Sequence, residues 1–287
     1  MNRIIKILNS FVIDNFFIAI CSIGMVFSTF LLNNIPLTLS PFIVFLALST
    51  YLLYNFHRIS FYLDFSRWRK FFDSMMKVNL GIAEKLFFII SISGILICIF
   101  QIHPRIYPYL LPLAFLAISY SVPLFGKGGS KRKLREFYLI KTPVLAAVWG
   151  FTTTIIPLVE YNISLESSFV GLQIISRTLF VFALCIPFEM RDMEIDKKNN
   201  IRTLAVICGL KNTRLIGLGI VALEIITHHL MVPLSSASIY ALDLSSLVAM
   251  FLILIQNEKR SPFFYKLYVD GNMLIRFIFL FIAIKTQ

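Results

Sequence analysis

Three carboxylates occur at a regular spacing in the segment EMRDMEID, where a long apolar run gives way to charged residues. Glu189, Asp192 and Asp196 are separated by three and then four positions, so a helix through the segment places all three on one face. Carboxylates stacked in this way repel one another, and a bound cation removes that cost. Magnesium suits the pattern because it takes one or two carboxylates, keeps part of its water and completes its shell with phosphate oxygens.

The residues that follow the carboxylates are basic. Lys197, Lys198 and Arg202 carry N–H donors that suit the outer oxygens of the same phosphate group. A second interpretation fits the spacing equally well: an ordinary polar helix end at the membrane edge, with Arg191 and Lys197 in salt bridges to the acids. The spacing alone leaves both interpretations open.

Apolar segments must position these side chains. The chain has 287 residues, 58% of them hydrophobic, and a mean hydropathy of +0.81, which favours a membrane protein with several spans over a soluble domain. Windows of about 20 apolar residues predict nine transmembrane helices, and we expect an all-α integral membrane protein with a single domain over residues 1–287. The spans cover residues 11–32, 41–54, 86–102, 106–125, 142–159, 169–188, 215–232, 241–256 and 267–284.

Basic residues are distributed unevenly between the two sides of these spans. Most of the 27 lysines and arginines lie in the loops of one side, whereas the short loops of the other side contain only Arg105. By the positive-inside rule, this asymmetry predicts a cytoplasmic N-terminus, cytoplasmic motif-bearing loops and an outer C-terminus. We expect the membrane to be a bacterial inner membrane. The net charge of +12 is explained by this topology, so we expect no nucleic-acid partner.

Two segments resemble a known family. EMRDMEIDKKNNIRTLAVICG resembles the second aspartate motif of the UbiA-type membrane prenyltransferases, D-x-x-D-x-x-x-D followed by a basic stretch and TLAV..G. Glu189 stands in for the first acid, and the matching positions are Asp192, Asp196, Thr203, Leu204 and Gly209. SYSVPLFGKGGSKRKLREFYLIKTPVLAAVW resembles the family's Tyr-Ser-x-Pro loop and lysine-bearing helix through Tyr120, Ser121, Pro123, Lys141 and Trp149. With the span count, the resemblance covers essentially the whole chain.

This resemblance implies a UbiA-like prenyltransferase bundle with cytoplasmic cap loops. The implied reaction transfers a polyprenyl group from its diphosphate to a lipophilic, aromatic acceptor, so the partners are these two molecules and membrane lipid. The implied cofactor is magnesium, with Asp192 and Asp196 as catalytic residues and with Glu189, Asp192 and Asp196 as metal ligands. The residues expected to bind the diphosphate are Asn55, Arg58, Tyr120, Lys127, Lys133, Lys141 and Lys197.

The first motif of the family departs from its pattern in this chain. The expected N-D-x-x-D-x-x-x-D reads NFHRISFYLDF here. Asn55 matches, but Phe56, Ile59 and Leu63 occupy the acidic positions, and Asp64 comes one residue late. One residue turns a helix by about 100°, so Asp64 is a poor replacement.

Two explanations of this departure remain open. In the first, His57 and Arg58 replace one magnesium and meet the diphosphate directly with positive charge, because a guanidinium can do part of the electrostatic work of a metal. In the second, the ionisation chemistry is lost. The protein is then a catalytically inactive family member that binds a lipid or prenyl diphosphate, or acts as a membrane assembly partner.

Four ionisable residues lie inside the predicted spans at a similar depth, namely Arg177, Glu224, Asp243 and Arg276. Isolated charges at the middle of a bilayer cost several kcal/mol, so they pair or face a wet cavity. We therefore expect a neutralising network among the sixth to ninth helices, with two arginines facing two acids. We expect His228 and His229 to lie at the interface.

Overall fold

The computed structural model describes residues 15–59, 82–124, 133–134, 137, 139–257 and 259–286, with the backbone alone for residues 57–59 and 82–85. Each of the nine predicted spans coincides with one α-helix in these ranges. The helices are α2 (Phe16–Leu32), α3 (Pro41–Ile59), α5 (Ile82–Gln101), α6 (Tyr107–Ser121), α7 (Lys141–Glu160), α8 (Ser168–Lys198), α9 (Leu204–His229), α10 (Ser236–Ile255) and α11 (Asn272–Lys285). A 3₁₀ turn, η1 (Pro104–Ile106), precedes α6, and a π-helical turn, η3 (Phe264–Val269), precedes α11.

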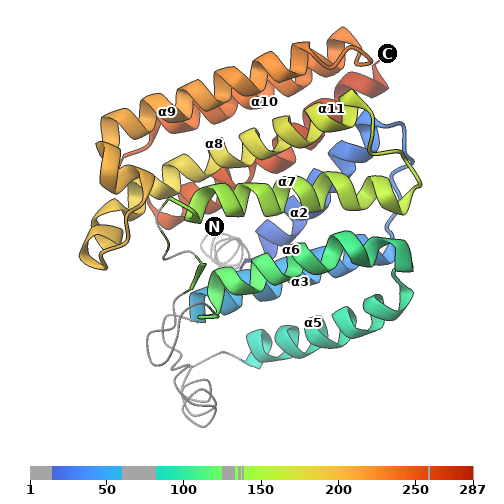
Figure 1. Ribbon diagram of the computed structural model, residues 1–287, viewed down its shortest axis with the longest axis horizontal. Coiled ribbons are helices and arrows are strands. Elements are labelled where there is room, and N and C mark those ends of the chain that lie inside the picture. The colour runs from blue at the N-terminus through green and yellow to red at the C-terminus, as the bar shows by residue number, and fades with distance from the viewer. Residues whose placement is uncertain are drawn as a thin grey trace, which may run out of the picture.

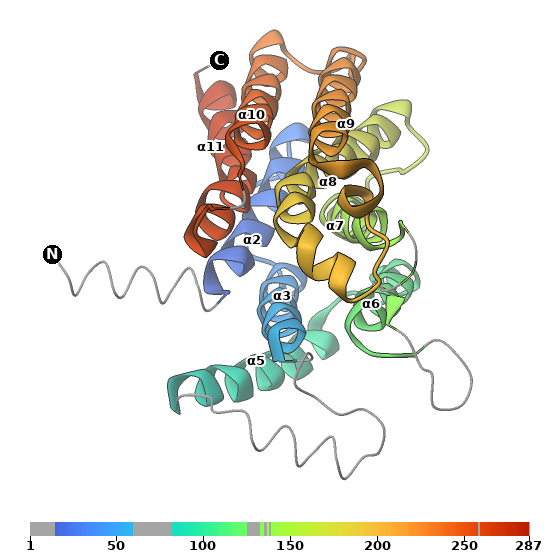
Figure 2. The ribbon, with the colours of Figure 1, turned by 90° about the vertical axis from the view of Figure 1, so that its left-hand side faces the viewer.

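Most of the helices run along a common direction, as Figure 1 shows, whereas α5 lies across them in Figure 2 and is bent by 104° from the helix that follows it. Viewed from one end (Figure 2), α8 and α2 lie near the centre, α9, α10 and α11 lie on one side, and α5 lies at the opposite edge. α8 packs against α7, α9, α10 and η3, whereas α5 packs on α3. Large apolar side chains on α5 point outward, including Phe100 at 88% exposure and Ile89 at 61%. Such a surface is unfavourable in water and is expected where a helix meets lipid.

Several helices are long and apolar enough to cross a membrane. Five helices in the described residues are long and apolar enough: α7, α8, α9, α10 and the continuous segment Phe264–Lys285. The pair Leu86–Gln101 and Pro104–Ser121, bent by 104°, adds a sixth if it forms one broken span, and α2 and α3 are apolar but shorter. These findings support an all-helical membrane protein, while the full count of nine spans stays a prediction.

The length of α8 carries the acidic motif beyond the apolar run. The Ser167 hydroxyl accepts a hydrogen bond from the Val170 backbone N–H and caps the start of the helix, and Lys197 and Lys198 lie in its last turn, where cations oppose the helix dipole. Its 31 residues extend roughly 45 Å at 1.5 Å per residue, against a hydrocarbon core of about 30 Å. The sixth span therefore continues as one helix through the three carboxylates, as their spacing predicted.

α9 is broken near its start. Gly209 has φ 75° and ψ 164° inside the helix, a conformation that glycine adopts without the steric cost that other residues incur. The break separates the first turn, which begins at Leu204 after the N-cap residue Thr203, from the long apolar part of the helix. The backbone conformation at this break thus explains why the TLAV..G pattern has a glycine at its last position.

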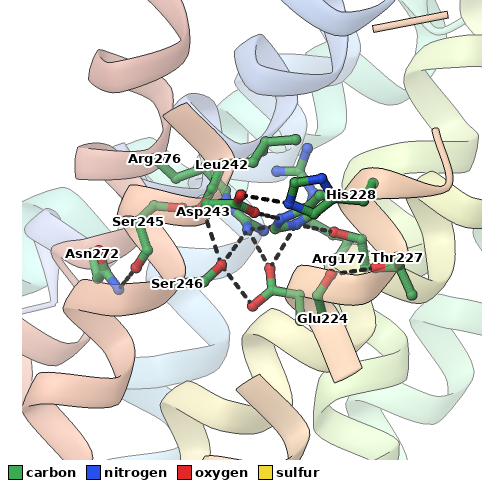
Figure 3. A network of polar contacts seen from close by, with 12 residues as sticks. Arg177, Glu224, Thr227, His228, Leu242, Asp243, Ser245, Ser246, Asn272 and Arg276 are labelled. Carbon is green, nitrogen blue, oxygen red and sulfur yellow. Dashed lines mark hydrogen bonds and ion pairs between the residues drawn. The ribbon is translucent and has the colours of Figure 1, made fainter. Parts of the chain in front are cut away.

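A buried polar network joins α8 to α11 in the part of the bundle shown in Figure 3. The Arg276 guanidinium forms an ion pair with the Glu224 carboxylate, at 1% and 0% side-chain exposure. Arg276 Nε also donates to Ser245 Oγ at 3.0 Å, Ser246 Oγ donates to Glu224 Oε2 at 3.0 Å, and the guanidinium lies 3.7 Å over the Phe180 ring. The pairing of one arginine with one acid is confirmed.

The other two charges have different partners from those predicted. Asp243 contacts two histidines, His228 Nδ1 at 2.8 Å and His229 Nε2 at 3.0 Å. His228 is fully buried inside the bundle, whereas the His229 side chain is 55% exposed; their expected interfacial depth stays a prediction. Arg177 donates to the Met25 carbonyl at 2.9 Å and to Thr29 Oγ1 at 3.2 Å on α2. The expectation that Arg177 faces an acid is therefore wrong, because its position on α8 directs it toward α2.

Candidate functional site

The three carboxylates of α8 lie on the face that packs into the bundle. Glu189 and Asp196 are buried, at 3% and 6% exposure, and the Asp192 side chain is 27% exposed. The inward position of this face follows from the helical spacing. The described residues contain no group of three or more His, Cys, Asp or Glu side chains gathered around one metal position, so the assignment of these acids as metal ligands stays a prediction.

Two residues at the start of α7 hold the buried acids. Lys141 Nζ contacts Asp196 Oδ2 at 2.9 Å, with the lysine side chain 21% exposed. The Thr142 hydroxyl donates a hydrogen bond to Glu189 Oε1. The predicted diphosphate ligand Lys141 is thus placed directly beside the acidic motif. Because the α7 helix begins here, both contacts also fix the distance between α7 and α8.

Glu189 offers one unused acceptor. Its second oxygen, Oε2, is buried and has no hydrogen-bond partner among the described residues. A buried polar atom without a partner costs about 1–3 kcal/mol, and buried polar groups in native proteins are nearly always satisfied. A carboxylate oxygen in this condition is chemically suited to a divalent cation.

Asp192 is engaged by its neighbour in the chain. Arg191 Nε donates to Asp192 Oδ1 at 2.7 Å and Nη2 donates to Oδ2 at 3.1 Å, a bidentate pair. The guanidinium of Arg191 also lies over two rings, 4.7 Å from the centre of Tyr265 and 5.1 Å from that of Phe188. Arg191 therefore links the acidic end of α8 to η3 through cation–π contacts. This contact also agrees with the open interpretation in which Arg191 forms a salt bridge with the acids.

The end of α3, where the first motif is expected, lies beside the start of α2. Asn55 is buried, and its Nδ2 donates to the Tyr51 carbonyl at 3.0 Å. Its Oδ1 accepts from Asn15 Nδ2 at 3.1 Å, and Asn15 Oδ1 accepts from Lys266 Nζ at 2.9 Å. Sequence reasoning placed Asn55 here but missed Asn15 and Lys266. No spacing pattern could have found them, because 251 positions separate them in the chain.

The remaining predicted diphosphate ligands have no described hydrogen bond or ion pair with the three carboxylates. Tyr120 lies in the last turn of α6, close enough to Tyr54 for the two hydroxyl groups to interact electrostatically. The Tyr54 ring packs edge to face against Trp149, with a centroid distance of 6.5 Å. Lys133 is half-buried. Lys197 is exposed and lines a surface hollow of about 360 Å³ together with Asn200, Ile201, Arg202 and Val206. The side chain of Arg58 and the whole of Lys127 lie outside the described residues, as does His57's side chain.

Comparisons with known proteins identify the fold. Neither a family model nor a curated protein sequence matches the chain. A solved structure of a UbiA homolog from Archaeoglobus fulgidus is similar over 96% of each chain, with a TM-score of 0.60 and 12% identity. The same values hold for its structure bound to GPP and Mg²⁺. A structure of digeranylgeranylglyceryl phosphate synthase is 13% identical, with a TM-score of 0.58, over 96% of this chain and 98% of that one. The fold is that of the UbiA-type prenyltransferases, which confirms the resemblance at the level of the fold.

Proposed function

We propose that this chain, which has the fold of the UbiA-type prenyltransferases, transfers a polyprenyl group from its diphosphate to a lipophilic, aromatic acceptor. The observation that carries the proposal is the grouping of Glu189, Asp196 and Lys141 at one end of α7 and α8, where an unpartnered carboxylate oxygen lies near an ion pair. In the same fold, the UbiA homolog from Archaeoglobus fulgidus is bound to GPP and Mg²⁺ and to DMAPP and Mg²⁺.

The proposal includes the topology. The chain is a single domain of nine spans in a bacterial inner membrane, with its N-terminus and the loops that flank the site in the cytoplasm and its C-terminus outside. The distribution of lysine and arginine supports this orientation. The site then lies at the cytoplasmic side, where a soluble pyrophosphate product is released into water.

Magnesium fits the donor set. Glu189, Asp192 and Asp196 supply oxygen ligands of the kind that magnesium prefers, and Glu189 Oε2 is a buried acceptor without a protein partner in the described part of the chain. When bound, the ion offsets the negative charge of the diphosphate and of the departing pyrophosphate. Lys141 and Arg191 now neutralise two of these acids, so both cations exchange a carboxylate for a phosphate oxygen when the site is occupied.

The chain's residues then perform defined tasks. Lys141 donates to a phosphate oxygen as the C1–O bond of the allylic diphosphate breaks and its electron pair leaves with pyrophosphate. Tyr54 and Trp149, which pack edge to face on each other, are our candidates for cation–π stabilisation of the allylic cation. The acceptor ring attacks the cation at C1, and the proton displaced from that ring is lost to a base.

A second function is favoured by the contacts of the acids. Asp192 and Asp196 are both paired with cations, and the described residues show no assembled metal cluster. A protein that binds a prenyl diphosphate or lipid without ionising it would need no more than this. The second candidate is therefore a catalytically inactive binding or assembly protein with the same fold.

A binding and turnover experiment separates the two functions. Purified protein is incubated with magnesium and labelled farnesyl or geranylgeranyl diphosphate, and bound ligand and released pyrophosphate are both measured. Asp196→Asn is expected to lose the part of the binding that magnesium adds, while Glu194→Gln, at an exposed position on the same helix, is expected to leave binding unchanged. Pyrophosphate release with any of a panel of lipophilic aromatic acceptors supports transfer. Binding without release supports the inactive protein, and absence of binding refutes both functions.

A further inference from the structure

A lysine outside every predicted motif is joined through one asparagine to the residue of the first aspartate motif that the chain retains. Lys266, in η3, donates from Nζ to Asn15 Oδ1 at 2.9 Å, and Asn15 Nδ2 donates to Asn55 Oδ1 at 3.1 Å. Asn55 is the residue of that motif that the chain retains. The Lys266 ammonium is therefore two hydrogen bonds away from Asn55, while the side chains at positions 59 and 63 of the motif lie outside the described residues.

The bridge between this lysine and α3 has the features of a built site. Asn15 and Asn55 are buried, at 5% and 4% exposure. Asn15 is the N-cap of α2 and adopts a left-handed conformation, with φ 65° and ψ 13°, which asparagine tolerates better than most residues. This backbone turn points its amide group toward both partners, so both ends of that side chain are used. The Asn55 amide is held in turn by the Tyr51 carbonyl.

The local helix geometry also sets the position of Lys266. η3 is π-helical, and the Asp270 backbone N–H donates to the Tyr265 carbonyl at 3.0 Å, five residues back. Such wide turns are rare and occur frequently at functional sites. The turn brings Asp270 into electrostatic range of Lys266 on one side and of Arg191 on the other. Asp270 is itself buried, at 9% exposure.

The π-turn also connects Lys266 to the acidic end of α8. Tyr265, the preceding residue, lies under the Arg191 guanidinium at 4.7 Å and beside the Phe188 ring at 5.5 Å. Figure 2 looks onto this end of the bundle, where α3 and α8 end and α2 begins. Cations from three elements thus converge on one region: Lys141 from α7, Arg191 from α8 and Lys266 from η3.

We propose that Lys266, oriented by Asn15 and Asn55, supplies the positive charge of the missing first-motif metal and binds the prenyl diphosphate directly. The inference rests on the proposed function. An ammonium has three N–H donors, so Lys266 keeps its bond to Asn15 while it donates to a phosphate oxygen. The site is therefore mixed: a metal-binding half on α8 and a metal-independent half on η3.

The test measures equilibrium binding of labelled geranylgeranyl diphosphate to the full-length protein in magnesium and in excess chelator. The wild-type protein is expected to retain weak but measurable binding in chelator. Lys266→Gln, which can keep a hydrogen bond to Asn15 without the charge, is expected to lower this binding by roughly tenfold to a hundredfold, the range for hydrogen bonds to charged groups. Lys266→Arg is expected to restore most of it.

Two further variants give the matched comparisons. Lys259→Met makes the same charge change at an exposed position just before η3 and is expected to bind like wild type. Asp196→Asn is expected to lose the increment that magnesium adds and to keep the binding seen in chelator. Size-exclusion profiles and thermal unfolding of each variant establish that it is folded.

The outcomes separate this inference from the proposed function. If the wild-type protein binds the diphosphate only with magnesium, or if folded Lys266→Gln binds it in chelator as well as wild type does, Lys266 does not have this role and the proposed function stands. If the wild-type protein binds no prenyl diphosphate under either condition, the proposed function fails and the inference fails with it.

Discussion

The ion pair between Arg276 and Glu224 makes a quantitative prediction about the stability of the bundle. Both side chains are almost completely buried, and removing one partner of such a pair costs roughly 3–5 kcal/mol because an uncompensated charge stays inside. In Arg276→Met, Glu224 keeps the Ser246 hydroxyl at 3.0 Å and His228 at 3.3 Å. The loss is therefore expected near the lower end, about 3 kcal/mol.

The reverse change leaves the cation behind and is expected to cost more. In Glu224→Leu, the groups left to Arg276 are the Ser245 and Ser246 hydroxyls, His228 Nε2 and the Phe180 ring. None of them is a carboxylate, so they compensate a full charge poorly and we expect about 4 kcal/mol. The double variant Arg276→Met/Glu224→Leu removes both charges and fills the space with apolar groups. Its expected cost is below about 2 kcal/mol, because apolar replacement of a whole buried pair is often close to neutral.

The assay is reversible unfolding in mixed detergent micelles, followed by circular dichroism and analysed as a double-mutant cycle. Lys285→Met, at the exposed end of the same helix α11, is the control and is expected to change stability by less than about 0.5 kcal/mol. Single-variant losses that simply add in the double variant would refute the reasoning. They would mean that the two charges do not stabilise each other.

Three further predictions concern the site and its support. Gly209→Ala is expected to destabilise the protein by about 1 kcal/mol or more because a side chain is strained at φ 75°. Gly219→Ala, which has the same open space but a helical backbone, is the control and is expected to be neutral or stabilising. Equal thermal unfolding temperatures of the two variants would contradict this prediction. Lys141→Met is expected to weaken prenyl diphosphate binding by roughly tenfold or more. It is also expected to strengthen the binding of magnesium alone, measured by titration calorimetry, because Asp196 loses its competing ammonium. Unchanged magnesium affinity would exclude the proposed exchange of the Lys141 ammonium from Asp196 to a phosphate oxygen. Removing magnesium with a chelator is expected to stop pyrophosphate release by the wild-type protein, and continued release would show that the α8 acids do not act through a metal.

The elements of the fold could be predicted from the sequence because their signals are local. Apolar windows found the position of each helix, since lipid imposes the same requirement on every span. The spacing of Glu189, Asp192 and Asp196 also predicted that α8 continues beyond the apolar run, because helical periodicity needs no knowledge of neighbouring helices.

The partners of individual side chains depend on how helices are rotated about their axes, which the apolar windows do not report. Arg177 and Asp243 have the predicted depth, but α8 turns Arg177 toward α2, and Asp243 meets two histidines. The same limit applies to Lys266. Its bond to Asn15 connects the two ends of the chain and depends on a π-helical turn that no residue pattern announces.

The projection of α8 beyond the hydrocarbon core has a consequence for how an amphiphile would sit in the protein. The carboxylates lie in the final turns of the helix. In the proposed topology they are therefore at the level of the lipid headgroups, while the apolar part of the bundle is at the depth of the acyl chains. A molecule with a charged head and a long isoprenoid tail has the same polarity profile as the surrounding phospholipids. Such a molecule would therefore keep the same orientation and the same depth in the proposed site as in the leaflet. The length of α8 thus sets the depth of the acidic site relative to the lipid headgroups.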